Sequence, residues 1–294
     1  MKLAVLYAGQ GAQHPGMGKE FYEGSPAFRA AFDSAELDFD LHRVCFEDPD
    51  GVLNQTEYTQ PCMVAFACGV TAVLAQQGVK PAYVAGLSLG EYSALEAAGV
   101  FTAKQAIELT AFRGKAMAEA AKGLACGMTA VLGLDRTALS ACCEQASALG
   151  CVQICNYNCP GQLVISGNID AINAACEKLK AAGAKRALPL KVGGAFHSPL
   201  MQPAKEELEE AIKAVEVKAP KCPVYQNVDG MPHTDPAEIK ANLIAQLTSS
   251  VRWTASVQNM IKDGADDFTE CGPGKALQGM IGRIDKNVSA HGIA

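Results

Sequence analysis

One serine of this chain stands in a setting typical of a catalytic nucleophile. Ser88 is the centre of Gly86-Leu87-Ser88-Leu89-Gly90, a G-x-S-x-G pattern between two apolar segments. When this pattern joins a strand to a helix, the chain reverses so sharply that side chains beside the serine would collide with either element. The turn exposes the hydroxyl at the positive end of a helix dipole, where backbone N–H groups can hold an oxyanion. The pattern favours acyl chemistry at Ser88 over an ordinary turn with an incidental serine.

A serine nucleophile needs a general base, and the chain has five histidines. His197 lies in the glycine-rich segment 193–201, which we expect to leave a strand and enter a helix at Pro199, with Ser198 as the N-cap. Loops between regular elements often carry catalytic side chains. His197 is therefore the candidate base, with an ordinary structural histidine as the alternative. Surface or satisfied core positions are expected for His14, His42, His233 and His291, with a site-lining role left open for His14.

A second glycine-rich turn follows the first predicted strand. In Gly9-Gln10-Gly11-Ala12-Gln13 the third glycine of a dinucleotide fingerprint is missing, and so is the Lys-Ser/Thr pair of a phosphate-binding loop. We expect this turn to lie beside the serine turn at the carboxyl edge of the sheet, where open α/β sheets bind ligands. One of its backbone N–H groups would supply a second oxyanion donor; the alternative is a simple tight turn.

Arg113 is the charged residue whose surroundings most need an explanation. It lies on an otherwise apolar helix face, among Ala111, Phe112 and Met117. A buried guanidinium is costly unless a carboxylate meets it. The partner is either an Asp or Glu of the protein or a substrate carboxylate held by two parallel hydrogen bonds.

Composition narrows the class of protein. Of the 294 residues, 49% are hydrophobic and 19% charged, and the formal net charge of −6 argues weakly against nucleic acid binding. The first residues lack the long apolar region of a secretory signal, and no apolar run approaches the roughly eighteen residues of a membrane span. The sequence therefore predicts a cytoplasmic protein without nucleic acid or membrane partners.

The twelve cysteines are scattered through apolar segments, which in a cytosolic chain indicates reduced, buried thiols. No C-x-x-C pair is present. Cys151, Cys155 and Cys159 are spaced by four residues and have no clustered histidine, so we expect no metal site.

The elements that would position these residues alternate between strand and helix. Residues 2–8, 82–86, 223–228 and 267–270 read as strands, and 17–35, 60–77, 91–98, 103–121, 199–214, 237–247 and 254–263 read as helices. This alternation predicts a doubly wound parallel α/β sheet. Between them, strands at 128–133, 152–156, 163–166 and 185–191 and helices at 136–148 and 169–182 follow the β-α-β-β-α-β order of a ferredoxin-like unit. We expect a catalytic body of residues 1–123 and 192–294 with an inserted subdomain of residues 124–191.

Six segments carry a family resemblance through their order and spacing. They are GQGAQ from residue 9, GLSLGEYSAL from 86, AFRGKAM from 111, NYN from 156, GAFHSPLM from 194 and GPGK from 272. Together they resemble the malonyl-CoA:acyl-carrier-protein transacylase family over nearly the whole chain. The resemblance implies a hydrolase-like α/β body carrying the ferredoxin-like subdomain.

The resemblance also implies roles for particular residues. Ser88 matches the acylated nucleophile, His197 its base, and Arg113 the ligand of the malonyl carboxylate, with Met117 and Phe196 as further substrate-binding residues. Backbone N–H groups of Gln10 and Leu89 match the oxyanion hole, and the main-chain carbonyl of Gln246 matches the group that orients the histidine. Many relatives have His where this chain has Leu87, which removes a hydrogen bond near Ser88 but no catalytic group.

The implied reaction moves a malonyl group from malonyl-CoA to the phosphopantetheine thiol of acyl carrier protein in a ping-pong sequence, in support of fatty acid synthesis. It needs no metal or redox cofactor. Lys185, Arg186, Lys191, Lys275 and Arg283 are candidates for docking an acidic carrier. The alternatives are a polyketide-system malonyltransferase, a serine thioesterase or esterase, and a non-catalytic carrier-binding module.

Overall fold

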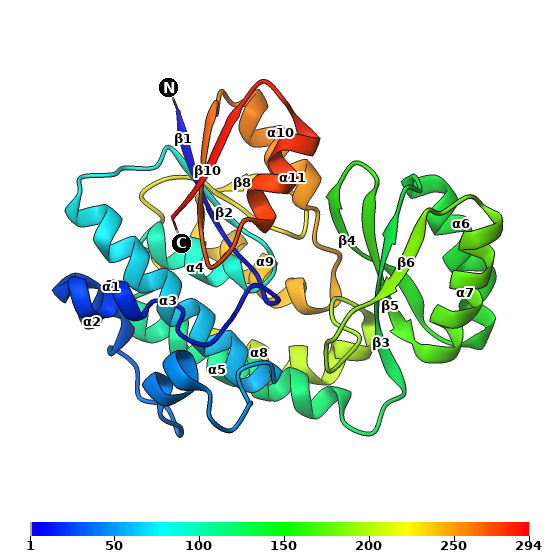
Figure 1. The fold of residues 1–294 in the computed structure, drawn as a ribbon, viewed down its shortest axis with the longest axis horizontal. Helices are drawn as coiled ribbons and strands as arrows, with labels where there is room; N and C mark the ends of the chain where they lie inside the picture. Colours follow the sequence, from blue (N-terminus) through cyan, green and yellow to red (C-terminus); the bar gives the residue numbers. More distant parts are fainter. Residues whose placement is uncertain (1, 294) are drawn as a thin grey trace.

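The computed structural model describes residues 2–293, and within them the body is built on a six-stranded sheet in the order β10-β9-β1-β2-β7-β8 (Figure 1). The strands are β1 (Leu3–Tyr7), β2 (Tyr83–Gly86), β7 (Val224–Tyr225), β8 (Pro232–His233), β9 (Asp267–Cys271) and β10 (Ser289–Ile293). β8 runs antiparallel to β7, and the other neighbours are parallel. The expected parallel α/β body is confirmed.

Both faces of the sheet are covered, which explains why β1 is a continuous apolar run. Val5 and Tyr7 pack into the larger hydrophobic cluster, and Ala4 and Leu6 pack into a second cluster on the opposite face. The first face is covered by α3 (Thr56–Gln76), α4 (Gly90–Ala97), α5 (Ala103–Ala121), α8 (Gln202–Ala214) and α9 (Pro236–Ala245). The second is covered by α10 (Trp253–Lys262) and α11 (Ala276–Ile284).

The subdomain stands at one side of the body, shown in green in Figure 1. Its elements are β3 (Cys126–Leu132), α6 (Arg136–Ala146), β4 (Val152–Cys159), β5 (Gln162–Asn168), α7 (Ile169–Ala181) and β6 (Arg186–Pro189). The strands form an antiparallel sheet in the order β4-β5-β3-β6, with α6 and α7 packed on one face. This is the expected ferredoxin-like arrangement; the boundaries at residues 124 and 191 stay predictions.

Several elements differ from those expected. Instead of one helix over 17–35, there are α1 (Lys19–Gly24) and α2 (Pro26–Phe32), because Ser25 is extended before Pro26 and its hydroxyl caps the second helix. The edge strands β8 and β10 and a π-helical turn at Arg43–Glu47 were not expected.

No uninterrupted apolar run of membrane-spanning length occurs, as expected, but one helix, α3, meets the length and mean composition of a span. This helix is 21 residues long and apolar enough to cross a bilayer, but 72% of its most apolar window is buried inside the protein. Its composition is explained by packing, since α3 lies between α2 and α5 in the core of the body.

Candidate active site

The turn at Ser88 has the strained geometry that its glycines suggested. Ser88 lies between β2 and α4 with φ of +53°, in the left-handed region that a non-glycine residue rarely adopts. A Cβ atom on Gly86 would overlap the backbone of Gly90, and a Cβ on Gly90 would overlap the carbonyl of Tyr7. Glycine at both positions lets the chain reverse and leaves the serine hydroxyl at the edge of the sheet.

The two glycine-rich turns lie side by side, as predicted, because β1 and β2 are adjacent parallel strands. The Leu87 N–H donates to the Tyr7 carbonyl at 3.0 Å, and a Cβ on Gly9 would press on the Leu87 carbonyl. Gln10 and Leu89 line the same cavity as Ser88. Among residues 2–293, neither backbone N–H has a protein acceptor, so both remain available to a bound oxyanion.

His197 contacts Ser88 directly. Its Nε2 lies 2.6 Å from the Ser88 Oγ, and its Nδ1 lies 2.9 Å from the main-chain carbonyl of Gln246. Since a carbonyl only accepts, Nδ1 carries the proton and Nε2 is free to take the serine proton. Burial and, secondarily, the charge of Arg113 lower the pKa of His197 to about 4, so the ring is neutral at physiological pH. His197 also has a positive φ, +55°.

Arg113 is 1% exposed and points its guanidinium at the nucleophile from α5. Nη1 donates to Gln60 Oε1 at 2.8 Å, while Nη2 lies 3.2 Å from Gln246 Oε1 and 3.4 Å from Ser88 Oγ. Its guanidinium carbon also sits 5.5 Å from the ring centroid of Tyr92. Burial lowers the pKa of Arg113, and no Asp or Glu in the described part of the chain lies within 4.0 Å. Within the described residues no carboxylate forms a salt bridge with Arg113, although the buried Glu91 carboxylate is near enough to offset part of that lowering.

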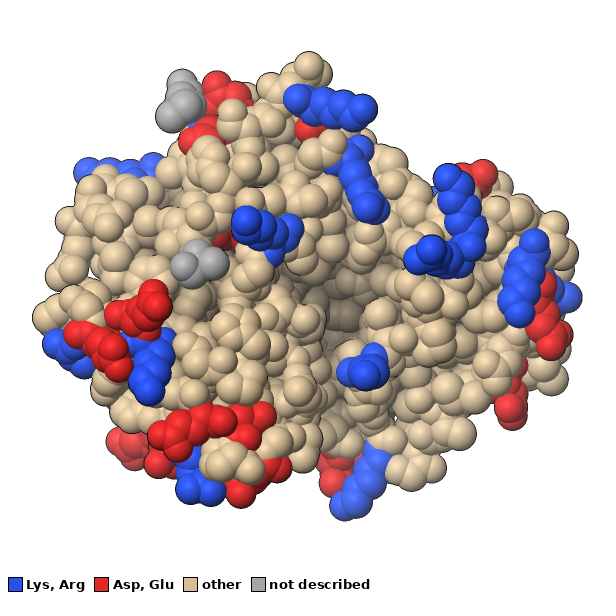
Figure 2. All heavy atoms as spheres, in the orientation of Figure 1, with Lys and Arg blue, Asp and Glu red and all other residues tan. Residues whose placement is uncertain are grey.

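These residues surround a cavity of about 410 Å³ between the body and the subdomain. Figure 2 shows the hollow that opens there on one face of the molecule. Met117 and Phe196 line the cavity, as expected. Further lining comes from Met128, Val164 and Leu190 of the subdomain, from Val192 just after it, and from residues 273–275 after β9.

Four functional candidates were given no role from the sequence, although two of them lie in the NYN segment quoted above. Asn156 and Asn158 line the cavity from β4, and their buried Oδ1 atoms lack a partner within the described structure. Their spacing of two in a strand was a usable signal, since it puts both on one face. Gln60 and Asn227 carried no such signal: Gln60 holds Arg113, and Asn227 Oδ1 accepts from the Ser88 N–H at 2.7 Å.

The other histidines lie away from the site. His14 is exposed and His42 pairs with Asp33, whereas His233 contacts Asp229 and His291 contacts Asp267. His14 does not line the cavity, so the site-lining role left open for it is not supported. All twelve cysteines are free thiols. No cluster of three or more potential metal ligands occurs within residues 2–293.

A serine in a strained turn, a neutral histidine hydrogen-bonded to it and two free N–H groups define an acyl-transfer site. The family model described as "Acyl transferase domain" matches residues 5–288, and the chain belongs to this family.

Named relatives are similar over nearly their full length. The chain is 40% identical to the malonyl CoA-acyl carrier protein transacylase of Bacillus subtilis, covering 100% of this chain and 93% of that protein. It is 39% identical to the enzyme of the same name from Staphylococcus aureus, over 99% and 95% of the two chains.

Solved structures agree. An acyl carrier protein S-malonyltransferase from Vibrio cholerae superposes with a TM-score of 0.96 at 41% identity, over 100% of this chain and 97% of that one. A malonyl-transacylase solved in complex with a type II polyketide acyl carrier protein superposes with a TM-score of 0.96 at 37% identity, over 100% and 96%. The expectations of family, fold and acyltransferase class are confirmed.

Proposed function

We propose that this protein transfers a malonyl group from malonyl-CoA to the phosphopantetheine thiol of an acyl carrier protein through an ester on Ser88. The substrate choice rests on the position of Arg113, whose buried guanidinium lies 3.4 Å from the Ser88 hydroxyl and has no carboxylate of the described residues within 4.0 Å. Because a buried cation is destabilising without an anionic partner, Arg113 is suited to bind an anion, and the free carboxylate of a malonyl group is one.

The first half-reaction acylates the serine. As His197 Nε2 takes the Ser88 proton, the Oγ attacks the thioester carbonyl, and the resulting oxyanion is held by the N–H groups of Gln10 and Leu89. When the tetrahedral intermediate collapses, the carbon–sulfur bond breaks, and coenzyme A leaves with the proton held by His197. The malonyl group remains as an ester on Ser88.

The second half-reaction runs the same steps with a different thiol. The carrier's thiol gives its proton to His197 while its sulfur attacks the ester, and Ser88 leaves as the alcohol after regaining the proton. Arg113 holds the malonyl carboxylate through both halves, which fixes the ester carbonyl for attack. The reaction draws on no metal or redox cofactor at any step.

The contact made by His197 argues against a hydrolase. Serine esterases of this fold place an Asp or Glu behind the histidine, whereas here the Nδ1 partner is the neutral carbonyl of Gln246. A carbonyl orients the ring without adding a negative charge that would compete with a malonyl carboxylate for Arg113. A neutral ester would also leave the Arg113 charge without a partner.

The surface around the cavity suits an acidic carrier. Figure 2 shows Lys and Arg side chains around the hollow between the body and the subdomain. Lys275 lines the cavity, and Arg283 Nη1 donates to Gln162 Oε1 at the start of β5 at 3.1 Å. We propose that these residues, with Lys185, Arg186 and Lys191, dock the carrier in the cytoplasm, in support of fatty acid synthesis. A polyketide carrier is the alternative, because one structural relative was solved with such a carrier.

Intact-protein mass spectrometry after mixing with malonyl-CoA tests the proposal. We expect a malonyl adduct on Ser88 that disappears when a phosphopantetheinylated carrier is added. Ser88→Ala should form no adduct, because no other nucleophile occupies this turn. Rapid release of free malonate without an acceptor thiol would identify a hydrolase instead, and failure to form any adduct would favour a carrier-binding module.

A further inference from the structure

A buried asparagine that lies outside the nucleophile turn forms hydrogen bonds to two backbone groups of that turn. Asn227 follows β7 and is fully buried. Its Oδ1 accepts from the Ser88 N–H at 2.7 Å, and its Nδ2 donates to the Gly86 carbonyl at 2.7 Å. One side chain therefore ties the peptide group at the start of the turn to the peptide group of the nucleophile itself.

These hydrogen bonds hold a residue whose backbone conformation is unfavourable. A non-glycine residue at positive φ persists only where its surroundings over-determine it, and Ser88 has φ of +53°. Gln246 adds to the restraint, since its Nε2 donates to the Ser88 carbonyl at 3.0 Å and lies 3.3 Å from Asn227 Oδ1. The direction of the Ser88 hydroxyl thus depends on Asn227 as well as on the glycines.

A buried glutamate fixes the asparagine in turn. Glu91, in the first turn of α4, is 0% exposed. Its Oε2 accepts from the Asn227 backbone N–H at 2.6 Å and its Oε1 from Gln226 Nε2 at 3.2 Å. Within the described chain no cation lies within 4.0 Å of Glu91, and burial raises the pKa of this carboxyl to about 7. Burying a carboxyl group without a cation beside it destabilises the fold, so the presence of a glutamate at this position needs an explanation.

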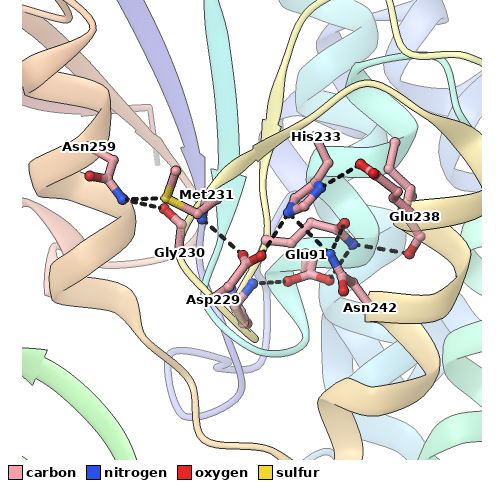
Figure 3. Close-up of polar contacts among 11 residues, drawn as sticks. Glu91, Asp229, Gly230, Met231, His233, Glu238, Asn242 and Asn259 are labelled. Atoms are coloured by element: carbon pink, nitrogen blue, oxygen red, sulfur yellow. Dashed lines mark hydrogen bonds and ion pairs between the residues drawn. The ribbon is translucent and has the colours of Figure 1, made fainter.

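Polar contacts continue outward from Glu91. Figure 3 shows Glu91 close to Asp229, His233 and Asn242, with Glu238 on the other side of His233. Asn242 Nδ2 lies 3.1 Å from Gln226 Oε1 and 3.1 Å from His233 Nε2. A separate contact holds the same loop at its far side, where Asn259 Nδ2 donates to the Gly230 carbonyl at 2.9 Å. The Arg252 N–H also donates to the Asn227 carbonyl at 2.8 Å, so contacts with Glu91, Arg252 and Asn259 all restrain the loop after β7.

We propose that Asn227 and Glu91 are positioning residues of the acyl transfer: Asn227 clamps the nucleophile turn, and Glu91 holds Asn227 in register through its backbone N–H. Neither touches the substrate. Their effect is on the direction of the Ser88 hydroxyl relative to His197, and a misplacement of about 1 Å there is enough to lower the rate about a hundredfold.

The test measures hydroxyl geometry without malonyl recognition. A fluorophosphonate probe reacts as Ser88 Oγ forms a bond to phosphorus, the phosphorus–fluorine bond breaks, fluoride leaves and His197 takes the proton. We expect Asn227→Ala and the smaller change Asn227→Ser to lower the second-order labelling constant by about tenfold to a hundredfold. In single-turnover acylation by malonyl-CoA, the maximal rate should fall similarly while the half-saturating concentration and the fraction of enzyme acylated stay unchanged.

Two comparisons separate positioning from stability. Asn259→Ala loosens the same loop without touching the nucleophile turn, so it should label at the wild-type rate even if its melting temperature falls. Glu91→Gln keeps an acceptor for the Asn227 N–H and should stay within about threefold of wild type, whereas Glu91→Ala should fall about tenfold.

The inference rests on the proposed role of Ser88, and the outcomes distinguish the two. A wild-type protein that neither probe nor malonyl-CoA labels at Ser88 overturns the proposed function. Wild-type labelling with undiminished rates in both Asn227 variants overturns the clamp. A loss of acylated fraction at unchanged rate, or an equal rate loss in Asn259→Ala, also overturns it, because that is the signature of general unfolding.

Discussion

The Arg113 guanidinium lies 3.4 Å from the Ser88 hydroxyl, so the cation sits beside the nucleophile and not at the far end of the cavity. An acyl group on Ser88 must carry its negative charge close to the ester carbonyl to reach Arg113. This suits a short diacid, in which one methylene separates the two carbonyl carbons. The arrangement therefore selects for both charge and length.

Removing the cation should invert the donor preference. In Arg113→Ala, kcat/KM for malonyl-CoA should fall about tenfold to a hundredfold while acetyl-CoA gains relative to it, because a charge-assisted pair contributes roughly 1.5–3 kcal/mol. Arg113→Lys should rescue poorly, since an ammonium cannot meet Gln60 and Gln246 while holding a carboxylate. Arg252→Ala, an exposed arginine outside the cavity, is the matched control. An unchanged malonyl-to-acetyl ratio in Arg113→Ala would mean that Arg113 is only structural.

The pH dependence should follow the low pKa of His197. Burial, reinforced by Arg113, holds this pKa at about 4, below the ordinary 6.5, so the neutral base is present at neutral pH and is lost only as pH falls through about 4. The profile of kcat/KM for malonyl-CoA should thus be flat from about pH 8 to 5. In kcat the acid limb should move to higher pH, because a bound malonyl carboxylate offsets the Arg113 charge. An acid limb near 6.5 in kcat/KM, with the protein still folded by circular dichroism, contradicts this reading.

Phe196 should limit the size of the acyl group. It lines the cavity beside His197 and is almost completely buried. Phe196→Ala should raise the ratio of kcat/KM for methylmalonyl-CoA over malonyl-CoA by about tenfold, the scale of one methyl group in a fitted pocket. Phe112→Ala, at a 40% exposed position on α5, is the control and should leave the ratio unchanged. If both variants give the wild-type ratio, Phe196 only packs the loop.

Carrier affinity should depend on basic pairs near the cavity despite the net charge of −6. Double charge reversal of Lys275 and Arg283, or of Lys185 and Arg186, should raise KM for the carrier and leave the rate of Ser88 acylation by malonyl-CoA unchanged. Double charge reversal of Lys178 and Lys180, on α7, controls for the change in net charge. The effect should shrink with added salt. If no pair raises KM, the carrier docks elsewhere.

The parts of the site that sequence reasoning located are those whose signal is local. Ser88 sits in a pattern that the turn geometry demands, and Arg113 stood out because its neighbours on the helix are apolar. The ferredoxin-like unit was predictable for the same reason, since its strands and helices alternate within one continuous stretch.

The features that could not be predicted depend on contacts between residues that are far apart in the sequence. Asn227 clamps Ser88 only because β7 lies beside β2, and a short strand of two residues gives little periodic signal. Gln60 meets Arg113 only because α3 packs on α5. The strand β10 is the five-residue segment SAHGI, whose Ser, His and Gly positions are exposed, so nothing in its composition indicated an edge strand.

The central sheet has a consequence for synthesis of the protein. β1 lies between β2 and β9, so Leu3 is paired with Asp267, and β10 completes the edge beyond it. A ribosome must deliver almost the entire chain before the first strand gains its second neighbour. Until then one side of β1 lacks its full cover, while the subdomain sheet, whose strands all lie within residues 126–189, can already pair. The chain is thus most prone to aggregation, and most dependent on chaperones, while the sheet of the body is still incomplete.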